Sequence, residues 1–116
     1  MRYYEMHLPM QNNAGTYNYA IERGIWETMA LKHCGGFSRS TVEGAWIDDN
    51  GQTKIEAMVV YKIATDASDI DVLINAAFEV FPDQAAVFVA RCGTAEIYSR
   101  SKAFNDQASK SFDVIG

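Results

Sequence analysis

The most informative stretch of the chain is residues 35–61, GGFSRSTVEGAWIDDNGQTKIEAMVVY. It predicts two β-strands joined by a tight turn. Asn50 and Gly51 supply the turn signal, because an Asn-Gly pair readily adopts the positive φ angles that a short hairpin turn requires. We therefore expect a hairpin with strands at 37–48 and 52–65. This hairpin is the centre from which the rest of the fold is predicted.

One carboxylate, Glu56, lies inside the otherwise apolar second strand of this hairpin. A buried carboxylate without a partner costs free energy, so we expect Glu56 to have one. Two interpretations remain open: a structural ion pair with Lys54 or Lys62, and recognition of an ammonium group or another cation. Trp46 and Tyr61 can offer aromatic faces to a cation or a purine ring, and equally each can be a core or interface residue.

The remaining elements follow from hydrophobic periodicity and from the turn residues. We expect helices at 16–33 and 68–81 and further strands at 2–10, 85–91 and 95–99. Gly35 and Gly36 end the first helix, and Ser68 is the expected N-cap of the second. The order β-α-β-β-α-β predicts a ferredoxin-like α+β sandwich, an antiparallel sheet with two helices on one face.

The first helix has two apolar faces. Ile21, Ile25 and Leu31 lie on the face that we expect to pack against the sheet. Tyr19 and Trp26 lie nearly opposite, and we expect a subunit contact or the C-terminal tail to cover them. The second hairpin strand is also apolar on both faces, so we expect the chain to self-associate through the sheet face that the helices leave open.

The chain has 116 residues and a formal net charge of −5. This length predicts a single domain, residues 1–98, followed by a polar tail or arm, residues 99–116. An acidic chain is poorly suited to bind nucleic acid, which requires clustered Lys and Arg. The sequence shows neither a membrane span nor the apolar core of a signal peptide, so we expect a cytoplasmic protein without a membrane partner.

No motif for covalent or metal-assisted catalysis is recognisable. Cys34 and Cys92 lack zinc-type spacing, and His7 and His33 form no paired ligand pattern, so we expect no metal. The strand serines have no nucleophile-elbow context. An enzyme built from this sequence would work by positioning its substrate and by the electrostatics around it.

The hairpin resembles the central part of the phage S-adenosylmethionine lyases. In that family a Gly-x-aromatic step precedes an acidic residue by about a dozen positions; here the step is Gly44-Ala45-Trp46 and the acid is Glu56. The similarity continues through the second helix and the phrase PDQAAVFV, residues 82–89, and covers roughly 34–98. The sequence departs from the pattern after Glu56, where Ala57 stands in place of the second acid that can occur there.

The resemblance implies a lyase that needs no cofactor. The carboxylate of S-adenosylmethionine would attack its own γ-carbon and release methylthioadenosine and homoserine lactone. Glu56 would be the catalytic residue that anchors the α-ammonium group, with Trp46 and Tyr61 as substrate-binding residues and Ser38 and Ser40 as polar lining.

The resemblance also implies a homotrimer with sites between subunits, in the host cytoplasm if the protein is phage-encoded. The alternative is a non-catalytic oligomeric protein of the same fold that binds a ligand or modulates the host, in which Glu56 forms an intersubunit salt bridge. A third possibility is an antirestriction or host-modulating interaction protein, which is consistent with the acidity of the chain but has no motif to support it.

Overall fold

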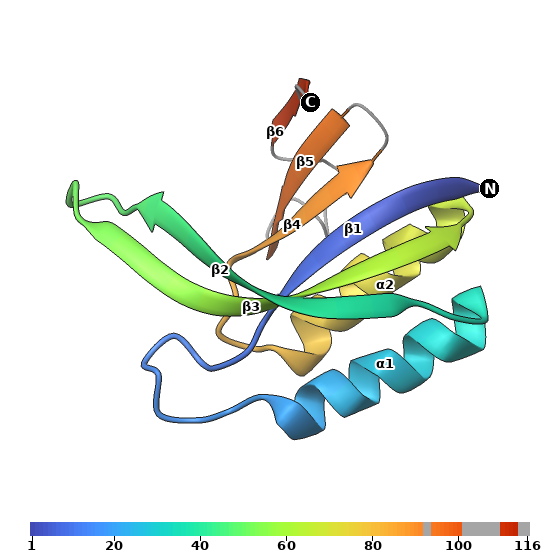
Figure 1. Ribbon diagram of the computed structural model, residues 1–116, viewed down its shortest axis with the longest axis horizontal. Helices are drawn as coiled ribbons and strands as arrows, with labels where there is room; N and C mark the ends of the chain where they lie inside the picture. The colour runs from blue at the N-terminus through green and yellow to red at the C-terminus, as the bar shows by residue number, and fades with distance from the viewer. Residues whose placement is uncertain (92–93, 101–109, 114–116) are drawn as a thin grey trace.

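The part of the chain that the computed structural model describes forms two helices and six strands (Figure 1). The structure describes the backbone of residues 1–91, 94–100 and 110–113, and the side chains of residues 1–91 and 98–100. The elements in chain order are β1 (Arg2–Pro9), α1 (Ala20–Cys34), β2 (Ser38–Ile47), β3 (Thr53–Thr65), α2 (Ala67–Val80), β4 (Ala86–Arg91), β5 (Thr94–Ser99) and β6 (Lys110–Asp113).

The strands form one sheet in the order β2-β3-β1-β4-β5-β6, and every neighbouring pair is antiparallel. The first four have the ferredoxin-like arrangement, so the predicted α+β fold is confirmed. β6 falls within the predicted tail and adds a strand at the edge of the sheet, whereas 101–109 and 114–116 lie outside the described residues. The boundary at residue 98 stays a prediction.

Both helices pack on one face of the sheet and beside each other (Figure 1). Alternate strand residues enter this core, for example Met6, Tyr61 and Val89, which lie side by side across β3, β1 and β4. Among the described residues, no helix is both long and apolar enough to cross a membrane.

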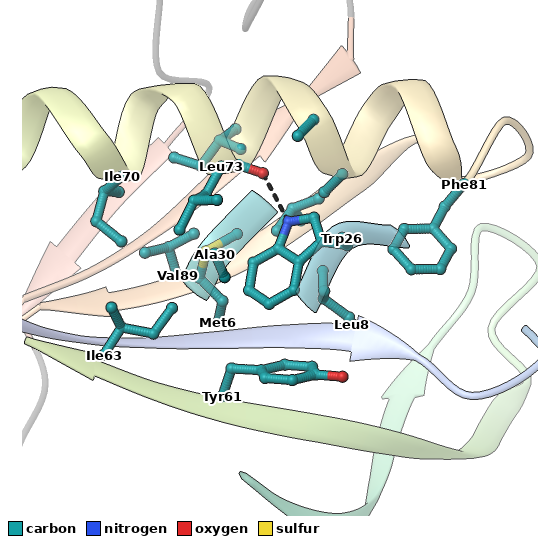
Figure 2. Packing of buried hydrophobic residues seen from close by; sticks show 14 of the residues in the cluster. Met6, Leu8, Trp26, Ala30, Tyr61, Ile63, Ile70, Leu73, Phe81 and Val89 are labelled. Atoms are coloured by element: carbon teal, nitrogen blue, oxygen red, sulfur yellow. Dashed lines mark hydrogen bonds between the residues drawn. The ribbon is translucent and has the colours of Figure 1, made fainter. Parts of the chain in front are cut away.

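The orientation predicted for α1 is wrong. Trp26 and Ala30 are fully buried, whereas Ile21 is 70% and Ile25 51% exposed. The indole Nε1 of Trp26 donates a hydrogen bond of 2.9 Å to the carbonyl oxygen of Leu73 in α2 (Figure 2). The helix turns its largest apolar side chain inward because that buries the most area and also gives the indole N–H a partner.

The ends of the elements follow the turn chemistry at most positions. Gly35 takes the left-handed conformation, with φ of 81°, and its N–H bonds to the carbonyl oxygen of Leu31. Gly51, with φ of 78°, turns the β2–β3 hairpin as predicted. One expectation fails, because Asp66, and not Ser68, occupies the N-cap position of α2, two residues earlier than predicted.

Candidate functional site

Glu56 lies where the β2–β3 hairpin leaves the rest of the sheet. The pairing of β1 with β3 ends at Pro9 and Met58, so the part of β3 that contains Glu56 pairs only with β2. Side chains alternate along a strand, which places Glu56 on the face opposite the one that carries Tyr61 and the helices. Glu56 is half-buried on this second face.

No ion pair neutralises Glu56 within the part of the chain that the structure describes. Lys54 contacts Asp48 instead, with Nζ 3.7 Å from Oδ2. Lys62 lies six residues further along β3, about 20 Å away at the rise of a strand. Within one chain, therefore, the structural ion pair with Lys54 or Lys62 is not formed, and Glu56 remains available to a cation.

The neighbours of Glu56 on this face leave it accessible from one side. Gly44 is directly opposite in β2, and a Cβ atom there would meet nothing closer than the Sδ of Met58, at 3.5 Å. Gly44 has no side chain that could cover the carboxylate, and the Met58 side chain contacts its position instead. Trp46 pairs with Lys54, so its ring stands on the same face at the diagonal position beside Glu56, and it is 46% exposed.

Burial raises the pKa of Glu56 above its ordinary value, and the negative charge of Asp83 raises it further. The ionised carboxylate is therefore held in an unfavourable environment. A cation bound at this position would relieve both effects. Residues with such perturbed pKa values are often found at functional sites.

Asp83 belongs to a hydrogen-bonded network that joins the segment after α2 to the loop after β1. Its carboxylate accepts hydrogen bonds from the hydroxyl of Tyr19 (2.5 Å), the backbone N–H of Asn13 (2.6 Å) and the side-chain amide of Gln84 (3.1 Å). Burial alone would raise the pKa of Asp83, but these hydrogen bonds lower it below its ordinary value. Asp83 therefore stays ionised and keeps its negative charge near Glu56.

Asp83 was not singled out in the sequence, although it lies in the phrase that resembles the lyases. Asp after Pro at the end of a helix is fully explained as a turn residue. No sequence signal therefore separates a turn role for Asp83 from a role at the site of Glu56. Its proximity to Glu56 comes from chain segments 27 residues apart and is visible only in the tertiary structure.

The structure does not gather the other predicted site residues around Glu56 in a single chain. Tyr61 is fully buried on the helix-covered face, and its hydroxyl donates to Oε2 of Glu27 in α1 at 2.5 Å. Ser38 and Ser40 share the face of Glu56 but pair with Lys62 and Val60. They lie about 20 Å and 13 Å from Glu56 along the strands.

The described residues contain no cluster of three or more His, Cys, Asp or Glu side chains that could hold a metal ion. His7 is half-buried beside Phe88, with ring centroids 4.8 Å apart. His33 and Cys34 lie at the C-terminal end of α1. Cys92 lies outside the described residues.

The fold is similar to that of a solved phage SAM lyase in complex with S-methyl-5′-thioadenosine. The likeness covers 99% of this chain and 89% of that protein, with a TM-score of 0.56 and 19% sequence identity. A phage SAM lyase in the apo state gives a TM-score of 0.46 at 18% identity. No protein-family model and no curated protein sequence matches the chain.

The comparison confirms at the level of the fold the resemblance found in the sequence. The chain thus has the α+β fold of a phage SAM lyase, with a half-buried glutamate that has no ion-pair partner among the described residues and that lies beside an exposed tryptophan.

Proposed function

We propose that this protein is an S-adenosylmethionine lyase that forms methylthioadenosine and homoserine lactone. The observation that carries the proposal is Glu56, a half-buried carboxylate without a cationic partner in the described chain, on a fold shared with a lyase of this kind. A substrate with an ammonium and a sulfonium group supplies the positive charge that this position lacks.

In the proposed reaction, Glu56 binds the α-ammonium group and fixes the orientation of the methionine moiety. A carboxylate oxygen of the substrate then forms a bond to its own γ-carbon, and the carbon–sulfur bond breaks with its electron pair passing to sulfur. The sulfonium becomes a neutral thioether, so charge is neutralised as the bond breaks. The protein accelerates this step by holding a near-attack conformer in a partly dehydrated site, without a cofactor or an external nucleophile.

Trp46 is the proposed aromatic contact of the substrate, because it stands beside Glu56 and half of its surface is free. Its ring can pack against the sulfonium or the adenine. Tyr61, Ser38 and Ser40 are not part of the site that one chain provides.

We further propose that the active site is completed between subunits of a homotrimer. The projecting end of the hairpin carries exposed apolar side chains on both faces: Trp46, Ile47 at 72% and Ile55 at 65% exposure. Such residues in a monomer indicate a surface that another molecule covers. A second copy packed on the hairpin would exclude water from Glu56. In a phage-infected cell, the enzyme would act in the host cytoplasm and deplete the methyl donor of restriction–modification systems.

The test is to incubate the purified protein with S-adenosylmethionine, without added metal, and to identify the products by chromatography and mass spectrometry. We expect methylthioadenosine together with homoserine lactone. Glu56→Gln should reduce turnover by roughly 10- to 150-fold, the factor that corresponds to one hydrogen bond to a charged group. The oligomer should remain assembled.

Glu43→Gln is the matched control, because Glu43 is an exposed glutamate in β2, next to Gly44, on the opposite face of the hairpin. It should retain turnover. If the wild-type oligomer consumes no substrate, the lyase assignment fails, and a non-catalytic binding protein becomes the better description. If Glu56→Gln turns over normally, Glu56 is not the ammonium anchor.

A further inference from the structure

A cavity of about 560 Å³ lies on the helix-covered side of the molecule, between α1 and the edge of the sheet. Its walls include Arg23, Gly24 and Glu27 of α1 and Arg39 and Thr41 of β2. Ser40 and Tyr61, two of the predicted substrate-binding residues, also line it, whereas Glu56 and Trp46 do not. The cavity is therefore separate from the lyase site proposed at Glu56.

The cavity is formed by the sequence of the first turns of α1. Ala20 and Gly24 face it at i and i+4, and a Cβ atom at Gly24 would have nothing within 4 Å. Small residues at this spacing lie on the same side of the helix and leave the space between α1 and β2 unfilled. The gap is bridged at one end by the ion pair of Arg39 with Glu27.

The side chains of Arg39 and Glu27 each keep hydrogen-bonding atoms that have no partner among the described residues. Arg39 donates through Nη1 to Oε2 of Glu27, and the hydroxyl of Tyr61 donates to the same oxygen. Among the described residues, no hydrogen bond ends on Oε1 of Glu27. A guanidinium has five N–H donors, so Arg39 retains donors beyond this one.

Arg23 plays a different part, because three hydrogen bonds already hold its guanidinium against the protein. Its Nη1 binds the carbonyl oxygens of Met10 (2.8 Å) and Pro9 (3.3 Å), and its Nη2 binds Oδ1 of Asn18 (3.2 Å). These bonds fix the loop after β1 against α1, so Arg23 is a rigid wall of the cavity. Met10 and Val59 add apolar surface.

We propose that this cavity binds a free α-amino acid with an apolar side chain. Such a ligand carries an ammonium group for Oε1 of Glu27 and a carboxylate for the remaining donors of Arg39. Its side chain would lie against Met10 and Val59. A zwitterion fits better than a simple anion or cation, because the cavity offers one free acceptor and one set of free donors within a single ion pair.

The proposal is tested by titrating the full-length protein, labelled with ¹⁵N, with L-leucine and following the amide signals of Ala20, Gly24 and Thr41. Leucinamide lacks the carboxylate, and Nα-acetyl-leucine lacks the ammonium group. We expect leucine to bind saturably and each derivative to bind at least about tenfold more weakly, as expected for the loss of one charge-assisted hydrogen bond.

Gly24→Leu should fill the cavity and abolish binding without unfolding the helix, because Leu has a higher helix propensity than Gly and the space beside Gly24 is open. Thr28→Leu, one turn further along the exposed side of α1, is the control and should bind normally. The proposal is overturned if leucine fails to bind at millimolar concentration, if Gly24→Leu binds equally well, or if either derivative matches leucine. None of these measurements depends on lyase activity.

Discussion

Tyr61→Phe tests whether Tyr61 holds the fold together or contacts the substrate. The ring of Tyr61 is completely buried between Trp26 and Phe37, and phenylalanine would retain that packing. The substitution removes one hydroxyl, and with it the 2.5 Å hydrogen bond to the carboxylate of Glu27. The hydroxyl also interacts with the side chain of Arg39, and the largest single loss is the charge-assisted hydrogen bond to Glu27.

The magnitude follows from the surroundings of that bond. The side chain of Glu27 is only 18% exposed, so solvent replaces the lost donor poorly, although Arg39 still pairs with the carboxylate. A hydrogen bond to a charged group contributes about 1.5–3 kcal/mol. For a domain of this size we expect the midpoint of thermal unfolding to fall by roughly 5–15 °C.

The assay is urea unfolding of wild type and variant, followed by tryptophan fluorescence. The two free energies of unfolding are compared with the same slope against urea concentration. Tyr17→Phe is the matched control, because the Tyr17 hydroxyl also bonds a glutamate, Glu22, but at an exposed position where the loss should be close to zero. Equal stability of Tyr61→Phe and wild type would refute the structural role of the hydroxyl. If turnover of S-adenosylmethionine collapses while stability is retained, Tyr61 contacts the substrate after all.

Three further predictions concern the core, the pH dependence and the hairpin turn. Trp26→Ala should lower the free energy of unfolding by about 3–5 kcal/mol, since it empties a fully buried site and removes the bond to Leu73, and urea unfolding checks this. Burial lowers the pKa of His7 below 6.5, against the smaller opposite effect of Glu5, so the unfolded chain binds a proton that the folded protein does not. Stability should therefore fall as the pH drops through the window just below 6.5, and His7→Gln should flatten that part of a pH series of unfolding curves. Gly51→Ala should cost about 1–2 kcal/mol by differential scanning calorimetry, because the residue has φ of 78° while its surroundings are open; an unchanged midpoint would show that the turn relaxes to another conformation.

Much of the fold was predictable because its signals are local. The Asn50-Gly51 turn, the glycine cap at Gly35 and the alternation of apolar residues each act over a few residues, and the structure confirms the elements that they predict. The α1 orientation was not predictable in the same way. Both the Ile21 side and the Trp26 side of α1 are apolar, so periodicity alone cannot choose the buried one.

The sequence by itself determined the order and type of the elements from β1 to β5, the helix-stopping and turn positions, and Glu56 as an unusual carboxylate within an apolar strand, but not β6. Only the tertiary structure decided which groups meet. It places Tyr61 against Glu27 and away from Glu56, and it brings the charge of Asp83 close to Glu56. The physical reason is that hydrogen bonds and charges act over a few ångströms in space, between residues whose separation along the chain carries no record of that proximity.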